Sequence, residues 1–147
     1  MEQKENSGYY KLDIYKFAHE LAIKVHAFTM NLPKYELFEE GSQVRRSSKS
    51  VSSNIVEGYA LRKYKNEYLH YLYRAHASAE ETIEHIRLIV ETQSIKDTRF
   101  CEELLNNYRQ LSSKIFNFIR SVESQHGTPF FLKEDSEIYP SKDIHET

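Results

Sequence analysis

The sequence predicts an all-α protein, an antiparallel up-down-up-down four-helix bundle, from three observations. The chain has only four glycines and three prolines in 147 residues, too few for the many turns of a sandwich or barrel. Four segments repeat apolar residues at steps of three and four, which lines them along one face of a helix. Short connections join these segments and make consecutive helices antiparallel neighbours. We expect one bundle over 9–124, a flexible N-terminus over 1–8 and a largely flexible C-terminal tail over 125–147.

The first two segments differ in how strongly they predict a helix. The first ends at Asn31-Leu32-Pro33, and its apolar stripe is Ile14, Phe17, Ala18, Leu21, Ala22, Val25 and Phe28. The second, about 39–58, has a sparse stripe of Val44, Ser48, Val51 and Ile55 and contains six serines. Because serine is a mediocre helix former, we expect tertiary packing to hold this helix, with small side chains letting neighbouring backbones approach. Gly58 is expected to end it.

The third and fourth segments carry the longest stripes. The third, about 65–93, presents Tyr68, Leu72, Ala75, Ala79, Thr82, Ile86 and Ile89. The fourth alternates steps of three and four without interruption through Cys101, Leu104, Tyr108, Leu111, Ile115, Phe118 and Val122. This last pattern is typical of a coiled-coil-like helix.

The chain holds more aromatic residues than these stripes use, with eleven tyrosines and eight phenylalanines. The large residues off the stripes include Tyr9, Tyr10, Tyr15, Tyr64, Tyr71, Tyr73, Phe38 and Phe116, together with Leu105. Aromatic side chains left over after a core is filled are typical of an interface, so we expect a homo-oligomer. The alternative is that tyrosine hydroxyls reach solvent from the edge of the core.

Composition excludes several classes of protein. A formal net charge of -2 does not give the strong positive field of a dedicated nucleic-acid binder, so any such binding needs a local patch. The N-terminus lacks the apolar stretch of a signal peptide, and no run approaches the roughly 18 apolar residues of a membrane span. The single cysteine, Cys101, excludes an intrachain disulfide and suits a reducing compartment. We expect a cytoplasmic protein with no membrane partner.

No catalytic or phosphate-binding motif is present in the sequence, and Cys101 falls on an apolar stripe, where a thiol is usually inert. We expect no enzymatic activity and no cofactor. Glu67 and His70 match one Glu-x-x-His pair of a di-iron bundle, but a second pair is missing. Glu81 and His85 lie one turn apart and could share a metal, although such pairs are more often solvated neighbours. A metal-binding bundle is the weakest hypothesis, and we expect no metal.

Two basic clusters form the candidate nucleic-acid site. The second helix carries Arg45, Arg46 and Lys49, and the connection after it carries Arg62, Lys63 and Lys65. Tyr59 and Tyr64 lie among them, and bases with aromatics can hold phosphates and stack on nucleobases. The alternative is that these are ordinary solvated ends, with Arg45 or Arg46 paired to a carboxylate of a neighbouring helix.

The run from Gln43 to Gly58, QVRRSSKSVSSNIVEG, resembles the signature of the four-helix-bundle family encoded by intervening sequences in bacterial large-subunit ribosomal RNA genes. Leu12-Asp13-Ile14-Tyr15 and the stretch from Tyr64 to His85 resemble its first and third helices, so the similarity covers about 11–122. Ser52 departs from a frequent proline and Ala77 from a frequent glycine, which should leave the second helix straighter and the helix separation slightly larger.

The resemblance implies a left-handed bundle, often a ring-like pentamer, with no known catalytic activity. Relatives include the accessory protein of diversity-generating retroelements, which is similar to a basic barrel that binds nucleic acid and its reverse transcriptase. The matching residues Asn54, Glu57 and Gly58 indicate a structural lock, in which a buried asparagine and glutamate find partners such as the arginines.

Our leading hypothesis from the sequence is a non-enzymatic, self-assembling scaffold or adaptor, with a larger protein as a candidate partner. The alternative is a nucleic-acid-binding accessory protein that holds RNA or DNA through the two basic clusters.

Overall fold

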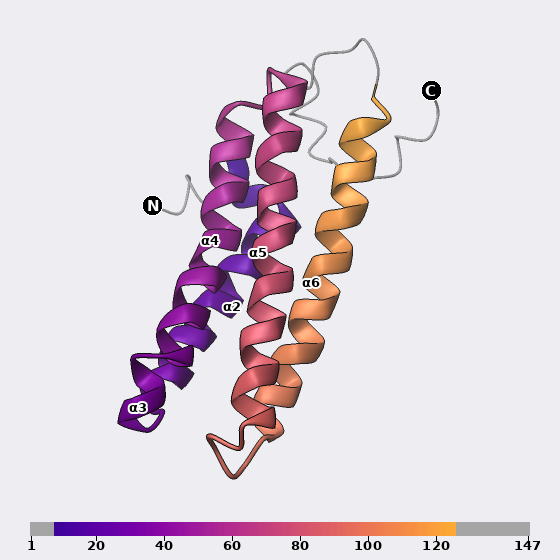
Figure 1. Cartoon of the computed structure of the whole chain (residues 1–147). Coiled ribbons are helices and arrows are strands. Elements are labelled where there is room, and N and C mark those ends of the chain that lie inside the picture. The colour runs from indigo at the N-terminus through magenta and orange to yellow at the C-terminus, as the bar shows by residue number, and fades with distance from the viewer. Residues whose placement is uncertain (1–7, 126–147) are drawn as a thin grey trace.

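Four long helices make up most of the protein in this computed structural model, which describes residues 8–125 (Figure 1). They are α2 (Asp13–Thr29), α4 (Glu40–Ala60), α5 (Lys65–Glu91) and α6 (Arg99–Glu123). A 3-10 turn, η1 (Gly8–Lys11), precedes α2, and the one-turn helix α3 (Lys34–Leu37) lies between α2 and α4. Within residues 8–125 there is no strand, so the all-α prediction is confirmed. The predictions for 1–7 and 126–147 lie outside the described residues.

The four long helices surround one core. Each packs on the next along the chain, and α2 also contacts α6. In Figure 1 the α4–α5 connection lies at the upper end of the molecule and the α5–α6 connection at the lower end. The contact between α4 and α5 is the most extensive in the bundle.

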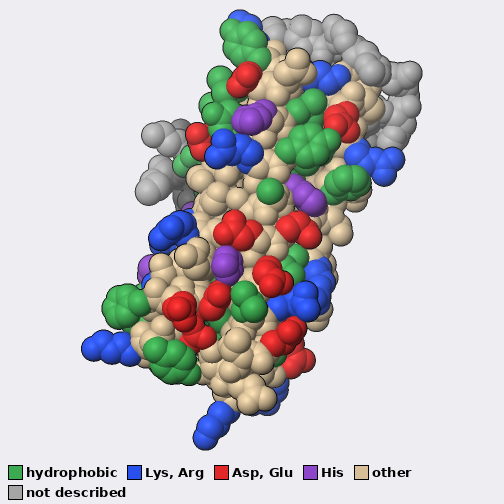
Figure 2. All heavy atoms as spheres, viewed as in Figure 1, with side chains coloured by type: hydrophobic (Ala, Val, Ile, Leu, Met, Phe, Trp, Pro, Cys, Tyr) green, Lys and Arg blue, Asp and Glu red, His purple; other side chains and the backbone are tan. Residues whose placement is uncertain are grey.

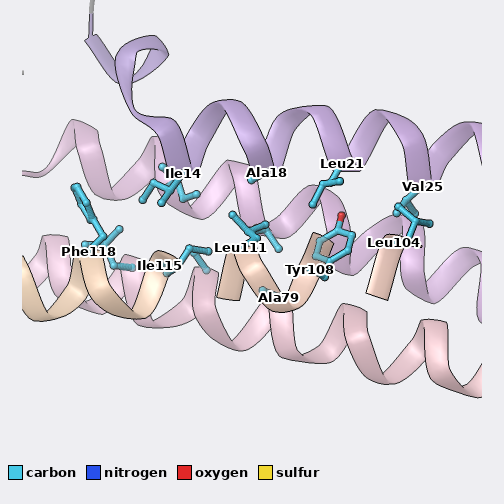
Figure 3. Packing of buried hydrophobic residues seen from close by; sticks show 14 of the residues in the cluster. Ile14, Ala18, Leu21, Val25, Ala79, Leu104, Tyr108, Leu111, Ile115 and Phe118 are labelled. Carbon is cyan, nitrogen blue, oxygen red and sulfur yellow. The ribbon is translucent and has the colours of Figure 1, made fainter. Parts of the chain in front are cut away.

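The predicted apolar stripes form this core. Every stripe residue predicted for α4, α5 and α6 is buried, while Phe17 and Phe28 on α2 are half-buried. Figure 3 shows Leu21 and Val25 of α2 beside Tyr108 and Leu104 of α6. Periodicity was sufficient to predict this set because burial on a helix repeats with its turn.

Gly58 does not end α4, contrary to the sequence-based expectation. The helix continues to Ala60, and Gly58 is buried against α5. A Cβ atom on Gly58 would lie 3.1 Å from Tyr71 Cβ and 3.3 Å from Tyr68 Cδ1. Because Gly58 has no side chain, α4 can approach α5 closely at this point.

About half of the off-stripe aromatics are used inside the molecule. Tyr9 stacks on Tyr10 with ring centroids 4.4 Å apart, and it meets Tyr15 and Tyr59 edge-on at 4.9 and 6.4 Å. Leu105 is buried in the core. The exposed aromatics of the predicted set are Phe38, Tyr64, Tyr73 and Phe116.

Candidate functional site

The two basic clusters lie at different heights along the bundle. Arg45, Arg46 and Lys49 are in the first half of α4, whereas Arg62 and Lys63 follow its last residue, Ala60. At a rise of 1.5 Å per residue, about 22 Å of helix separates Arg45 from Ala60. The six predicted residues therefore do not form one compact patch.

Arg45 is occupied in holding α3. Its Nη2 donates to the carbonyl oxygen of Leu37 at 2.9 Å, and its Nη1 is buried. A Cβ atom on Gly41 would lie 3.2 Å from that Nη1, so the guanidinium sits against the start of α4. The expected carboxylate partner is replaced by a backbone carbonyl at the end of a short helix, where acceptors are left over.

Arg62 and Lys65 also bind the protein's own backbone. Arg62 Nη1 donates to the Tyr59 carbonyl at 3.0 Å, and its guanidinium lies 4.0 Å from the centre of the Tyr59 ring. Lys65 Nζ donates to the carbonyl oxygen of Glu123 at 3.0 Å and also to that of Gln125. Lys65 thus ties the end of α6 to the start of α5, because the last carbonyls of a helix lack intrahelical donors.

Three of the six basic side chains face solvent. Arg46 and Lys49 are exposed one turn apart on α4, and Lys63 is exposed in the α4–α5 connection. Lys63 Nζ lies 5.7 Å from the centre of the Tyr64 ring. These three are the cations of the predicted set that a phosphate could reach most directly.

The family-motif residues differ from one another in their surroundings. Asn54 is buried, and its Nδ2 donates to the carbonyl oxygen and Oγ of Ser50 at 2.8 and 2.9 Å. Its partner is a serine of the same helix and not an arginine. Glu57 is exposed, so the prediction of a buried, arginine-paired glutamate is wrong. A carboxylate keeps its hydration on the solvent side of the helix, where it needs no buried partner.

A line of hydroxyl groups joins α4 to α5, and the sequence did not predict its pairings. Thr82 Oγ1 lies 2.8 Å from Ser47 Oγ and 2.8 Å from the Ser78 carbonyl oxygen, and Ser50 Oγ lies 2.8 Å from Ser78 Oγ. We call Ser47, Ser50, Asn54, Ser78 and Thr82 the α4–α5 polar cluster. The signal for it was the serine content of α4, since buried hydroxyls require partners.

The four residues of the metal hypothesis are not brought together. Glu67 and His70 are exposed near the start of α5, and His85 lies fifteen residues after His70. His85 instead bridges two carboxylates, with Nδ1 2.7 Å from Glu40 Oε2 and Nε2 3.3 Å from Glu81 Oε2. Among residues 8–125, no group of three or more His, Cys, Asp or Glu is arranged to hold a metal ion.

Ser112, His76 and Glu80 meet between α5 and α6, but not as a catalytic triad. Ser112 Oγ lies 3.1 Å from His76 Nε2 and also donates to Glu80 Oε2. In a triad the carboxylate orients the histidine, whereas here it contacts the serine. Burial, aided by the charge of Glu102, raises the pKa of Cys101 to about 11, so its thiol stays protonated and poorly nucleophilic at neutral pH.

The fold and these contacts define a small protein that is all-helical over residues 8–125 and in which several polar side chains join one helix to the next. The sequence profile of the family described as 23S rRNA-intervening sequence protein matches residues 10–117, and the chain belongs to that family. A solved structure from Bacteroides thetaiotaomicron, described as a protein with unknown function from the S23 ribosomal protein family, is 20% identical with a TM-score of 0.65. The similarity covers 75% of this chain and 97% of that chain, and at this identity it supports the fold alone. A search of curated proteins gives no match.

The helices of the described part of the chain were also compared with the requirements of a bilayer. None of those within residues 8–125 combines the length and the apolar character needed to cross one.

Proposed function

We propose that the protein is a non-enzymatic, self-assembling bundle that acts as a scaffold or adaptor. The observation that supports this most is an exposed apolar surface on α2 and α3. It consists of Ile23 and Ala27 on α2, of Met30 directly after that helix, and of Tyr35 and Phe38, which are 66% and 71% exposed, at α3. We call these five residues the α2–α3 surface. Large apolar side chains that stay exposed beyond those that a core uses are typical of protein contacts.

The spacing and support of these residues favour an interface over chance exposure. Ile23, Ala27 and the C-cap residue Met30 follow one another by four and three residues, so they share one side of α2 and of its last turn. Two contacts hold the α3 turn that carries Tyr35. Arg45 donates a hydrogen bond to the carbonyl oxygen of Leu37, and the buried carboxylate of Glu36 accepts one from Ser94. Aromatic side chains on a fixed backbone lose little entropy when they are buried by a second molecule.

We infer a closed homo-oligomer of left-handed, up-down-up-down bundles, and the family resemblance favours a pentamer. The α2–α3 surface would meet a different surface of the next copy, and such head-to-tail contacts generate rings when the rotation closes. The reduced, buried Cys101 is consistent with the cytoplasmic location that we propose. A larger protein would then bind the assembled copies.

The test is the mass of the protein in solution. We expect light scattering at micromolar concentration to give several times 17.5 kDa. Tyr35→Glu with Phe38→Glu should reduce the mass toward that of one chain, because buried charges oppose association. Tyr64→Glu, at the other end of the bundle, is the matched control and should keep the assembly. A wild-type monomer would overturn the proposal.

A second function is supported by the exposed cations on α4 and in the connection that follows it. Arg46, Lys49 and Lys63 are exposed, and we infer that they would hold phosphates of RNA or DNA. An oligomer would repeat them several times and add avidity. Affinity should fall steeply with added salt, and Arg46→Glu with Lys63→Glu should abolish it. Lys16→Glu, an exposed lysine on α2, is the control. Absent or salt-independent binding would remove this candidate.

A further inference from the structure

The His85 ring of α5 lies between two carboxylates, one on α4 and one on its own helix. Its Nδ1 is 2.7 Å from Glu40 Oε2, and its Nε2 is 3.3 Å from Glu81 Oε2. The side chains of His85 and Glu40 are 16% and 19% exposed, and that of Glu81 is 56% exposed. Figure 2 shows acidic side chains gathered around a histidine below the middle of this face. Each nitrogen of the ring therefore has a carboxylate as its neighbour.

These two contacts need a charged ring. A carboxylate oxygen accepts hydrogen bonds, and a neutral imidazole has a single N–H to donate, so the neutral ring can satisfy only one of the two carboxylates. The imidazolium has an N–H on each nitrogen and can satisfy both, and its charge strengthens each hydrogen bond. The geometry around His85 is therefore that of the protonated ring.

The charged groups around His85 are acidic. In the described part of the chain, its ion pairs are with the two carboxylates from α4 and α5, and none is with α6. Behind the first of these carboxylates, the carboxyl group of Glu36 is buried at α3. Arg87, the nearest arginine along α5, lies 3.7 Å from Glu84 Oε1 and 3.2 Å from Glu91 Oε2 instead. The imidazolium of His85 is therefore the cation that pairs α4 with α5 at this point.

The contact with Glu40 holds the first turn of α4. Glu40 is the first residue of that helix, and the residue before it, Glu39, makes no side-chain capping hydrogen bond. The backbone N–H of Glu40 instead donates to Glu36 Oε1 at 3.4 Å, and the other oxygen of Glu36 accepts a hydrogen bond from Ser94. The start of α4 and α3 are thus joined to each other, and His85 ties them to α5.

We propose that His85 is a proton-dependent clamp that holds α3 and the first turn of α4 against α5. The clamp is complete while the ring carries both protons. It loses its charge and one of its two hydrogen bonds as the pH rises through the range of about 5 to 8, in which histidine changes its charge. Because Tyr35 and Phe38 lie at α3, the clamp regulates how firmly the α2–α3 surface is held. This last step rests on the proposed function, whereas the clamp itself does not.

The test is amide hydrogen exchange of the full-length chain at pH 6 and at pH 8.5, corrected for the intrinsic effect of pH on exchange. We expect α3 and the first turn of α4 to exchange about fivefold faster at pH 8.5, because hydrogen bonds to a charged partner are stronger than neutral ones. The start of α5, at the upper end, should show no such change. His85→Gln should give fast exchange at both pH values, because glutamine does not titrate.

The matched control is His70→Gln, which replaces an exposed histidine of the same helix and should keep the pH dependence. Nitrogen-15 NMR of the His85 ring should show both nitrogens protonated at pH 6 and one at pH 8.5. A singly protonated ring at pH 6, equal exchange at the two pH values, or a pH dependence that survives His85→Gln would overturn the proposal. Neither measurement needs an oligomer, so a monomeric wild type would overturn the proposed self-assembly without affecting this test.

Discussion

Two glycines of α4 illustrate how single residues determine the packing of this protein. A Cβ atom on Gly41 would lie 2.7 Å from the carbonyl oxygen of Glu36, a backbone atom that cannot rotate away. The corresponding contact at Gly58 is looser, with 3.1 Å to Tyr71 Cβ. The sequence analysis singled out Gly58 as a helix end, but it did not show that either glycine allows a close approach, because periodicity does not identify the partner that comes close.

Gly41→Ala should destabilise the protein by about 2 kcal/mol, since overpacking outweighs the roughly 1 kcal/mol that alanine gains in a helix. Gly58→Ala should cost less, about 1 kcal/mol, because its contacts are longer. Urea unfolding measures both changes, and Ser53→Ala, at an exposed position of α4, is the control. Equal stability of Gly41→Ala and the wild type would contradict the described approach of α3 to α4.

Cys101 should make stability depend on alkaline pH. Burial raises the pKa of its thiol from 9.0 to about 11, so between these values the unfolded chain loses the proton while the folded chain keeps it. The stability that the thiol contributes is therefore full below pH 9 and is lost as the pH rises toward 11. Burial also raises the pKa of the Tyr108 phenol, which adds to the loss at higher pH.

The measurement is urea unfolding of the wild type and of Cys101→Ala at pH 8 and at pH 10.5. The variant should be less stable at pH 8, because it leaves a cavity, and the difference should narrow at pH 10.5. Tyr108→Phe should reduce the remaining pH dependence in the same way. An equal decrease in the free energy of unfolding from pH 8 to pH 10.5 in all three proteins would show that neither buried group causes the loss of stability at alkaline pH.

At the scale of the element, α4 is the helix that depends most on its neighbours. Its serines donate to their own helix, as Ser48 does to the Arg45 carbonyl at 3.1 Å and Ser52 to the Lys49 carbonyl at 3.2 Å, which does not favour a helix over other conformations. The extensive contact with α5 compensates for this weak intrinsic preference of α4 for the helix. The sequence predicted the helix and its buried side because α4 keeps its period, and it missed two terminal residues because Gly58 resembled a helix end.

Pairings between helices could not be predicted in this way. Ser47 meets Thr82, and Glu40 meets His85, because these residues stand at the same height in adjacent helices. Periodicity gives the angle of a residue around its helix but not its height relative to a neighbour. The α4–α5 polar cluster is therefore a result of the structure alone.

Thr82→Val should destabilise the bundle by about 1 to 2 kcal/mol, because it keeps the shape of the side chain and removes the hydroxyl that Ser47 contacts. A double-mutant cycle with Ser47→Ala in urea unfolding isolates the pair, and the two losses should not add. Ser52→Ala, whose hydroxyl bonds within its own helix, should change stability little. Additive losses would mean that the two hydroxyls act independently.

At the scale of the whole molecule, different contacts close the two ends of the bundle. At the lower end, Arg45 holds α3 and Glu36 accepts a hydrogen bond from Ser94. At the upper end, Lys65 holds the last carbonyls of α6. The sequence analysis placed Arg45 and Lys65 in the candidate nucleic-acid site. It could not separate the two roles, because arginine and lysine bind the carbonyls at a helix end as well as phosphates.

Lys65→Met should loosen the upper end without unfolding the protein. We expect amide hydrogen exchange to speed up at the end of α6 and the start of α5, and to stay unchanged near Ser94 at the lower end. The free energy of global unfolding should fall by about 1 kcal/mol. Lys63→Met, two residues earlier and exposed, is the control. Faster exchange along all four helices would contradict a local role.

The two ends of the described chain lie at the same end of the bundle. Tyr9 lies 6.4 Å from Tyr59, ring to ring, and Gln125 is held by Lys65, so both flank the α4–α5 connection. A linker could therefore join them without crossing the core, and new termini could open in the α5–α6 loop at the opposite end. Such a circular permutant would have a different order of helices along the chain and the same arrangement in space, so the bundle can be rewired while its core is preserved.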